Sequence, residues 1–449
     1  MAELGDVYLR HGVNLSKMSS AGLAGPTTVA PGDTQLASSI HDRCLHGARL
    51  LNCTGDRVAM NRKRILLVFG TRPEAVKMAP LIRALAEDGR CEPIVAVTAQ
   101  HREMLDQVLT LFEITPAYDL NMLAPGQTLT DITVNALVGL GPILESCKPD
   151  VVVVQGDTST TFAGALAAFY RQIPVVHLEA GLRTNDRYSP FPEEINRRLT
   201  TQLTTLHLAA TATAAANLER ENVPTDAIVI TGNTVIDALH WAVQHPTDYS
   251  DPRLEAIASG NSPVVLVTAH RRESWGEGMR SIGAALADIA QRHPTVEIVF
   301  PIHRNPLVRE AIIPEVAHLP NILILEPLAY GEFSRLLARC TVVLTDSGGV
   351  QEEAPSLGKP VLVMRDTTER PEAVAVGAAR LVGTDSERIA NGVSRLLTDA
   401  SAYAAMANVT SPYGDGHAAN RSVNAITHLL GIGERSANFV DQSSKVRFH

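Results

Sequence analysis

From residue 65 onward, short apolar runs alternate with longer segments in which apolar residues recur every three or four positions. Short runs of this kind predict strands and the longer spacing predicts helices. The first half has apolar runs at 65–69, 94–98, 151–154, 173–178, 205–210 and 227–231. Helices are predicted from Pro73 and over 102–113 and 128–147. The all-valine run 151–154 is typical of a parallel strand buried on both faces.

The alternation is interrupted at residues 240–262 and then begins again. Pro246 and Pro252 lie in this segment beside a Ser-Gly-Asn-Ser run, which indicates a hinge. Further strands are predicted at 264–268, 296–300, 322–325 and 342–344, with helices at 277–292 and 305–318. The pattern predicts an α/β protein with two doubly wound Rossmann-like domains and a ligand cleft between them.

The expected organisation follows from these breaks. The predicted parts are an extension at 1–60, an N-terminal domain at 61–239, the hinge at 240–262, a C-terminal domain at 263–411, a C-terminal helix within 412–432 that packs back on the N-terminal domain, and a tail at 433–449. Residues 1–60 are rich in Gly, Ala, Ser and Thr and lack a sustained period, which predicts a mobile segment.

The composition and charge of the chain argue against several classes of protein. The chain has 449 residues, 45% of them hydrophobic, which allows two full cores. A net charge of −9 argues against nucleic acid as a partner. No apolar run is long enough to cross a membrane, and the five scattered cysteines favour a reducing cytoplasm over a disulfide framework or a zinc site.

The strand at 342–344 leads into Asp346-Ser347-Gly348-Gly349 and then a helix. Unpaired amides at a helix N-terminus bind anions, and two glycines let a ligand approach them. Glu352 and Glu353 follow one turn later, where a carboxylate can accept a ribose hydroxyl. Together these features predict a sugar-nucleotide site, although a glycine-rich turn that only packs a helix gives the same pattern.

Three carboxylates follow strands or open helices in the first half. Asp157 and Glu179 come at the ends of two strands, and Glu193 opens a helix. The carboxyl ends of parallel strands meet at one sheet edge, so these acids can converge there. Carboxylates in proximity raise one another's pKa, which suits acid–base catalysis, whereas isolated ones serve as helix caps.

Basic residues face the same predicted crevice. Arg72 and Lys77 follow the first strand, and His270 with two arginines follows the first strand of the second half. No G-x-G-x-x-G or G-x-x-x-x-G-K-[ST] follows a strand, so neither a bound NAD nor a P-loop is expected. No Ser-His-Asp arrangement or metal-ligand spacing appears either.

Ordered motifs then resemble one family along residues 63–430. They are G-T-R-P-E-A at 70–75, T-A-Q-H-R-E-M-L at 98–105, G-D-T at 156–158, H-L-E-A-G-L-R-T at 177–184, P-E-E-I-N-R at 192–197, I-T-G-N-T-V-I-D at 230–237, H-R-R-E-S at 270–274 and D-S-G-G-V-Q-E-E at 346–353. The chain resembles the bacterial non-hydrolysing UDP-N-acetylglucosamine 2-epimerases. The resemblance implies a GT-B-like architecture and cofactor-free interconversion of UDP-GlcNAc and UDP-ManNAc for surface polysaccharides.

The resemblance also implies residue roles. The implied catalytic set is Asp157, Glu179, Glu193 and His270. Binding of the UDP-sugar is implied for Arg72, Lys77, Arg197, Ser347, Gly348, Gly349, Glu353 and Arg370. A second UDP-GlcNAc, acting as an activator, is implied at Gln100, His101, Arg102 and Gln127. The family also implies a homodimer.

Four alternatives remain open at this point. They are a GT-B glycosyltransferase, a hydrolysing epimerase, an epimerase of a UDP-diacetamido sugar, and a sugar-nucleotide sensor without catalysis. Two of these alternatives can be distinguished from an epimerase by experiment. A glycosyltransferase needs an acceptor substrate, and a sensor has no catalytic turnover that a substitution such as Asp157→Asn could remove.

Overall fold

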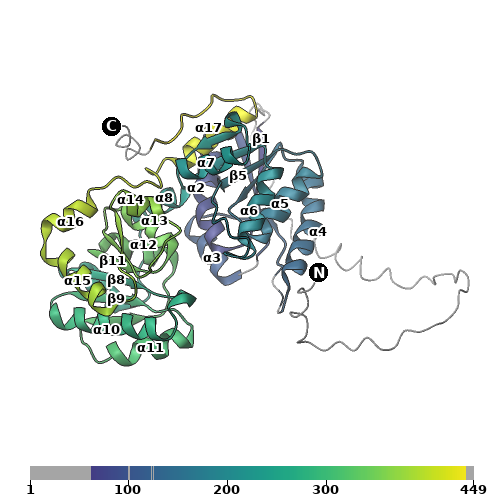
Figure 1. Ribbon diagram of the computed structural model, residues 1–449. Helices are drawn as coiled ribbons and strands as arrows, with labels where there is room; N and C mark the ends of the chain where they lie inside the picture. Colours follow the sequence, from purple (N-terminus) through teal and green to yellow (C-terminus); the bar gives the residue numbers. More distant parts are fainter. Residues whose placement is uncertain (1–61, 100–101, 123, 125, 441–449) are drawn as a thin grey trace, which may run out of the picture. The chain divides into compact units, whose positions relative to one another are not determined.

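The computed structural model describes residues 62–99, 102–122, 124 and 126–440, which belong to one compact unit, Met60–His449. The expected extension at 1–60, Gln100, His101 and the end of the tail from 441 lie outside the described residues. Figure 1 shows two sheets flanked by helices. The prediction of two doubly wound α/β domains is confirmed.

The first sheet has seven parallel strands in the order β3-β2-β1-β4-β5-β6-β7. Its strands are β1 (Lys63–Phe69), β2 (Cys91–Val97), β3 (Tyr118–Asp119), β4 (Val151–Gln155), β5 (Val175–Ala180), β6 (Leu206–Ala209) and β7 (Ile228–Ile230). The strand order reverses between β1 and β4, and a crevice forms beyond the carboxyl ends of strands at such a point.

Strand β1 is buried on both faces. Ile65, Leu67 and Phe69 belong to the core beneath α2 (Arg72–Asp88) and α3 (Arg102–Leu111), whereas Leu66 and Val68 pack with residues of α4 (Leu129–Cys147) and α5 (Ser159–Phe169). The alternation of side chains along a strand therefore divides one apolar run between two helical layers.

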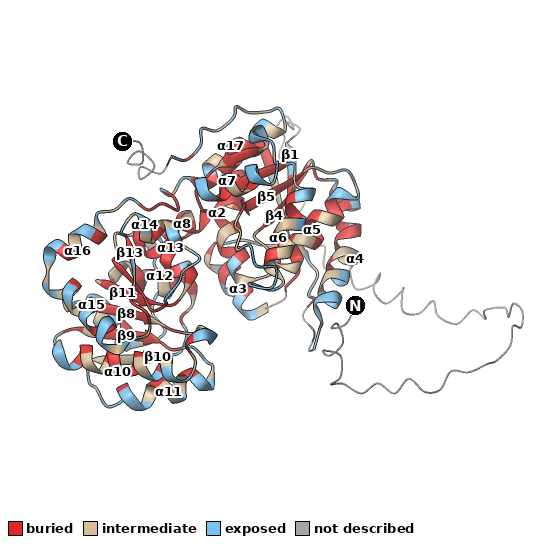
Figure 2. Cartoon of the chain, in the orientation of Figure 1, coloured by how far each residue is buried: buried red, intermediate tan, exposed pale blue. Residues whose placement is uncertain are grey.

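The second sheet has six parallel strands in the order β10-β9-β8-β11-β12-β13. Its strands are β8 (Val264–Thr268), β9 (Glu297–Pro301), β10 (Ile322–Leu325), β11 (Val342–Thr345), β12 (Val361–Val363) and β13 (Ala379–Leu381). Figure 2 shows both sheets buried beneath helices whose outer faces are exposed.

The remaining helices cover the two sheets. They are α6 (Glu193–Leu203), α7 (Ala212–Arg220), α8 (Thr234–Gln244), α9 (Pro252–Ser259), α10 (Glu277–Arg292), α11 (Pro306–Val316), α12 (Tyr330–Arg339), α13 (Gly348–Ser356), α14 (Pro371–Ala375), α15 (Ser386–Thr398), α16 (Ala400–Ala407) and α17 (Ala418–Leu429). Among the described residues, none of the helices is long and apolar enough to cross a membrane.

The segment 240–262 contains the end of α8 and all of α9, so much of the predicted hinge segment is helical. Asp251 caps α9, and Pro252 suits its first position because a proline lacks the amide that would be unpaired there. Helix α17 contacts α2 and α8, and Ala419 N donates a 2.8 Å hydrogen bond to Asp237 of α8. Helix α17 thus packs against helices of the first sheet.

Candidate active site

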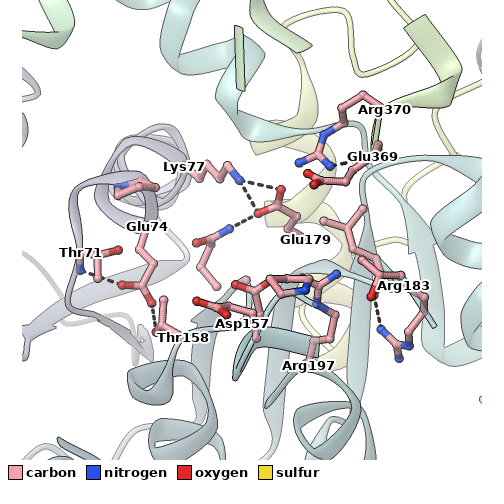
Figure 3. A pocket seen from close by; sticks show the side chains of 17 residues that line it. Thr71, Glu74, Lys77, Asp157, Thr158, Glu179, Arg183, Arg197, Glu369 and Arg370 are labelled. Atoms are coloured by element: carbon pink, nitrogen blue, oxygen red, sulfur yellow. Dashed lines mark hydrogen bonds and ion pairs between the residues drawn. The ribbon is translucent and has the colours of Figure 1, made fainter. Parts of the chain in front are cut away.

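A cavity of about 350 Å³ lies beyond the carboxyl ends of β4 and β5. Six residues predicted from the sequence line it: Lys77, Asp157, Glu179, Glu193, Arg197 and Arg370. Figure 3 shows the five of these other than Glu193 around a shared space. All of the six except Arg370 belong to the first sheet and its helices, whereas Arg370 directly precedes α14 beside the second sheet. The six predicted residues therefore bring three carboxylates and three cationic side chains to one cavity, whose lining also includes Glu74, Glu369 and Arg183.

The backbone at Glu179 is unusual for a residue with a side chain. Its φ of 65° lies in the left-handed region, and the register between β5 and β6 shifts between Leu178 and Ala180. Such a β-bulge redirects a side chain out of the normal alternation, at a cost that the surrounding structure must offset. Backbone strain of this kind concentrates at functional sites.

Lys77 pairs with Glu179 inside the cavity. Its Nζ lies 2.6 Å from both carboxylate oxygens, and Glu179 is only 8% exposed. Burial by itself raises the pKa of Glu179, but the charges of Lys77 and Arg370 and the hydrogen bonds from Lys77 and Asn233 outweigh it and hold the pKa below its usual value. Glu179 is therefore an ionised carboxylate with its charge already compensated.

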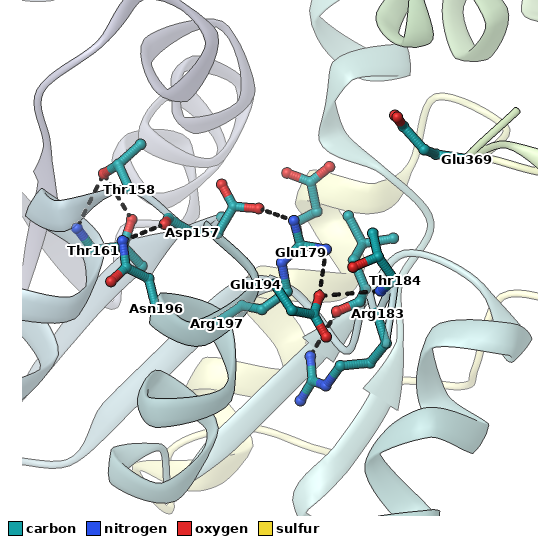
Figure 4. A network of polar contacts seen from close by, with 12 residues as sticks. Asp157, Thr158, Thr161, Glu179, Arg183, Thr184, Glu194, Asn196, Arg197 and Glu369 are labelled. Carbon is teal, nitrogen blue, oxygen red and sulfur yellow. Dashed lines mark hydrogen bonds and ion pairs between the residues drawn. The ribbon is translucent and has the colours of Figure 1, made fainter. Parts of the chain in front are cut away.

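Asp157 has a different environment. Arg197 Nη2 lies 2.7 Å from Asp157 Oδ2, and Asn196 Nδ2 donates to the Asp157 carbonyl at 3.0 Å (Figure 4). Burial, with a contribution from the negative charge of Glu179, raises the pKa of Asp157 in spite of Arg197. Two carboxylates that share one cavity thus have pKa values shifted in opposite directions, which is a pattern of acid–base pairs.

Helix α6 begins with two glutamates that have separate roles. Glu194 is fully buried, accepts a 3.0 Å hydrogen bond from Thr184 N and pairs with Arg198, whose Nε lies 2.9 Å away. Glu193 is half-buried, lines the cavity and has no side-chain hydrogen bond to any residue the structure describes. The sequence predicted Glu193, and it is the glutamate left free for a ligand.

Sequence reasoning missed the buried carboxylate of Glu74. It accepts hydrogen bonds from Gly70 N at 3.0 Å, Thr71 N at 2.7 Å and Thr158 Oγ1 at 2.6 Å, and burial raises its pKa. Thr71 and Glu74 form a capping box at the start of α2, a pattern that the spacing T-x-x-E could have revealed. Glu74 joins the loop after β1 to the loop after β4.

Two carboxamides beside Glu179 were also missed. Gln155 donates a hydrogen bond to Oε2 of Glu179, and Asn233 donates to Oε1 at 3.3 Å. Both residues are buried. Asn233 lies 54 positions from Glu179 in the sequence, and no local pattern predicts that contact.

His270 does not line the cavity. It follows β8, where its Nδ1 lies 2.8 Å from Asp346 Oδ1 and its amide donates to Asp346 Oδ2 at 2.7 Å. Burial alone raises the pKa of Asp346, but the contacts with His270 and the backbone amides of His270 and Arg271 lower it overall. The fixed Nδ1 leaves Nε2 of the half-exposed imidazole available to a ligand.

Ser347, Gly348 and Gly349 lie at the N-terminus of α13, beside His270. A Cβ added to Gly348 would lie 3.5 Å from Nη2 of Arg271, and one added to Gly349 would meet no atom within 4 Å. Ser347 N already donates to Thr345 Oγ1 at 2.9 Å, so the amides of Gly348 and Gly349, with the Arg271 guanidinium nearby, are the donors of this turn suited to bind an anion.

Glu352 and Glu353, both buried, have different partners. Glu352 accepts from Arg370 Nε, and from Asn233 Nδ2 at 2.8 Å. Glu353 accepts a 2.9 Å hydrogen bond from Tyr330 OH, and burial raises its pKa to about 7. Burial lowers the pKa of Arg72, while the nearby charge of Glu353 opposes this effect. Arg72 and Glu353 are thus neighbours, as are Arg370 and Glu352.

The predicted activator residues lie only partly in the described chain. Arg102 pairs with Asp106 at 2.9 Å and with Asp119, and Gln127 accepts a 3.2 Å hydrogen bond from Ala124 N. Neither residue lines the cavity. Within the described ranges, no three His, Cys, Asp or Glu side chains form a group that could hold a metal ion.

The chain is similar in sequence to known proteins of one family. A family model described as UDP-N-acetylglucosamine 2-epimerase matches residues 83–427. The UDP-N-acetylglucosamine 2-epimerase of Escherichia coli K12 is 56% identical over 370 residues, which cover 81% of this chain and 98% of that protein. The putative one of Thermotoga maritima is 50% identical and covers 84% of this chain and 99% of its own.

Solved structures show the same architecture. A putative UDP-N-acetylglucosamine 2-epimerase from Listeria monocytogenes superposes with a TM-score of 0.80 at 43% identity, covering 84% of this chain and 100% of its own. The UDP-GlcNAc 2-epimerase from Neisseria meningitidis, solved with bound UDP-GlcNAc, has a TM-score of 0.73 at 48% identity, covering 81% of this chain and 100% of its own.

Proposed function

The chain belongs to the UDP-N-acetylglucosamine 2-epimerase family, and on this basis we propose that it interconverts UDP-GlcNAc and UDP-ManNAc. The observation that supports this proposal best is the meeting of Asp157, Glu179 and Glu193 at one cavity that is also lined by four cationic side chains. Inversion of a sugar carbon requires groups that can accept and donate protons on two faces. The Neisseria relative was solved with UDP-GlcNAc bound, which fits the same substrate class.

The proposed reaction is an elimination followed by an addition. The proton on C2 has no adjacent carbonyl group to acidify it. Cleavage of the C1–O bond first sends the bonding electrons to the departing UDP and leaves an oxocarbenium-like C1, which acidifies that proton. A carboxylate then removes the proton to give 2-acetamidoglucal. UDP adds back to C1 while a proton reaches the other face of C2, so that every atom is conserved.

The environments of the carboxylates suggest their roles. Glu179, ionised beside Lys77, is suited to stabilise the positive charge that develops at C1. Asp157, with its raised pKa, is suited to hold and transfer the proton. Glu193, half-buried at the cavity wall, is the third carboxylate and is suited to serve the opposite face of C2.

The nucleotide is proposed to bind beside the second sheet. Ser347, Gly348 and Gly349 would hold the diphosphate, the two glycines through their backbone amides, and His270 would contact the departing oxygen through Nε2. Arg72, Arg197 and Arg370 would add positive charge, and Glu353 would accept a ribose hydroxyl. Closure around both intermediates would prevent loss of the glycal to water.

Three further properties rest on the family alone. They are a homodimer, activation by a second UDP-GlcNAc near Arg102 and Gln127, and a role in supplying surface polysaccharide synthesis. Sigmoidal initial rates with UDP-GlcNAc would support the activator. Hyperbolic rates that stay unchanged in Gln100→Ala would contradict it. The scattered cysteines favour a reducing cytoplasm for this work.

Proton NMR of the protein with UDP-GlcNAc in D2O, without an acceptor, tests the proposal. We expect UDP-ManNAc to appear with deuterium at C2. Free ManNAc with UDP would indicate a hydrolysing enzyme, and an unchanged spectrum would contradict epimerisation of this sugar. The Asp157→Asn protein provides the control, since loss of one proton carrier is expected to prevent the exchange.

A further inference from the structure

Asn233 lies between the two sheets and uses every polar group of its side chain. It caps α8, and its Oδ1 accepts a 3.1 Å hydrogen bond from Val235 N. Its Nδ2 donates to Glu179 Oε1 at 3.3 Å and to Glu352 Oε2 at 2.8 Å. The residue is only 3% exposed. One amide nitrogen therefore bridges two buried carboxylates from different halves of the chain.

We propose that Asn233 is a positioning residue that fixes the carboxylate of Glu179 toward the cavity and links it to Glu352. This inference rests on the proposed function, because it assigns a role around a carboxylate of that site. A carboxamide suits the task, since its nitrogen offers two hydrogens and adds no charge. Two carboxylates held this close would otherwise repel each other.

The link continues to the nucleotide side of the cavity. Arg370 Nε donates to Glu352 Oε1, so the contacts run from Arg370 through Glu352 and Asn233 to Glu179. A diphosphate that engaged Arg370 would alter its contact with Glu352. The orientation of Glu179 would respond through Asn233, and charge compensation at C1 would then depend on an occupied nucleotide site.

Other groups also face Glu179 and must be considered in any titration. They are Lys77 on α2, Gln155 on β4, Asp157 after β4, His177 on β5, Glu352 on α13 and Arg370 before α14. Lys77 and Gln155 hold the carboxylate from the first sheet. Asn233 is the described contact that joins it to the second sheet.

Asn233→Asp tests the role. Aspartate keeps the capping oxygen and the shape of the side chain, but it lacks the NH₂ donor and adds a negative charge between the two glutamates. We expect the pKa of Glu179 to rise by about one unit or more. Carbon NMR of glutamate-labelled protein measures this titration directly, with the Glu179 resonance assigned from Glu179→Gln.

Steady-state kinetics provide the second readout. If Glu179 must be ionised, the acidic limb of the kcat profile should move upward with that pKa in Asn233→Asp, so that kcat falls about tenfold along that limb and recovers at higher pH. KM for UDP-GlcNAc should change by less than about threefold. The added charge of Asn233→Asp contributes to this shift by itself, so Asn233→Ser, which removes the amide donor without adding a charge, separates the roles: a residue with only a capping role would leave both the limb and the titration unchanged in Asn233→Ser.

Asn305→Asp is the matched control, because Asn305 caps α11 through the same contact, to Leu307 N at 3.0 Å. Its pH profile should match that of the unmodified protein. If Asn233→Asp fails to fold, Asn233→Ser keeps a capping oxygen, removes the bridge and should shift the titration in the same direction. An unaltered Glu179 titration in the folded variant overturns the inference. Because the titration needs no turnover, an inactive unmodified protein contradicts only the proposed function.

Discussion

Replacing Lys77 with methionine removes the cation that pairs with Glu179 while it keeps most of the apolar side chain. The pair is well shielded, since the side chains are 18% and 6% exposed and Nζ lies 2.6 Å from the nearer oxygen. In the variant, Glu179 stays buried but loses part of the positive charge that balances its carboxylate. We therefore expect both stability and the charge state of Glu179 to change.

The magnitude follows from Coulomb's law. With charge centres about 3 Å apart and an effective dielectric constant of about 20, the attraction is about 5–6 kcal/mol. Breaking a buried ion pair from one side typically costs about 3–5 kcal/mol, because the remaining charge stays desolvated. Glu352 also loses a nearby cation when Lys77 is replaced. We expect the free energy of unfolding to fall by about 3 kcal/mol near neutral pH.

The loss of stability in Lys77→Met should depend on pH, and its direction can be derived. In the unmodified protein the pKa of Glu179 is lowered, so its stabilising contribution is present above the unfolded pKa and is lost as the pH falls through the folded one. Without Lys77, burial raises the folded pKa, and the ionised form destabilises the variant at higher pH. The difference between the two proteins should therefore be largest above about pH 7 and shrink toward about pH 5.

Urea unfolding at several pH values measures this difference. Lys63→Met is the matched control, because Lys63 pairs with Asp150 at 2.8 Å with side chains 34% and 31% exposed. That exposed pair should be worth only about 0.2–1 kcal/mol, without the same pH dependence. A Lys77→Met loss no larger than that of the control, or one that grows as the pH falls, would refute the reasoning.

Three further predictions address single groups. Asp157→Asn should lower kcat by about 10²–10⁴-fold with UDP affinity unchanged in calorimetry, and equal turnover would contradict a proton-transfer role. Glu353→Gln should become more stable relative to the unmodified protein as the pH rises from about 5 to 8, because the raised pKa of about 7 means that ionisation of Glu353 costs stability. Urea midpoints across that range measure the trend, and a constant difference would contradict the raised pKa. Gly349→Ala should leave the melting temperature unchanged, because the added Cβ meets no atom, yet weaken UDP binding by about tenfold or more if a phosphate approaches that amide. Unchanged UDP affinity would show that no phosphate binds at the Gly349 amide.

Glu193, and not the adjacent Glu194, is the candidate site residue that the sequence predicts. Glu193 and Glu194 are adjacent and chemically identical in sequence, yet Glu194 is fully buried in contacts with Thr184 and Arg198. Only Glu193 lines the cavity. The family motif pointed to the glutamate that lines the cavity, whereas helical periodicity alone cannot say which side of α6 faces a loop from β5.

His270 illustrates the opposite case. Its place at the end of β8 was predicted correctly, but the structure binds its ring to Asp346 and does not put it on the cavity wall. Its proposed role in catalysis stays a prediction. The sequence shows after which strand a residue lies. The residues that contact it in the folded protein, here Asp346, decide where its side chain points.

The sequence by itself determined most strands of the two sheets and the polar residues that follow them, because buried parallel strands require short apolar runs and polar residues follow where each run ends. It missed β3, β12 and β13, which are only two or three residues long. Only the tertiary structure decided the left-handed backbone of Glu179, its pairing with Lys77 and its bridge through Asn233 to Glu352. These contacts join residues 102, 54 and 119 positions apart. Local propensity cannot specify them, since they arise only when separate strand ends and helices meet in one desolvated space.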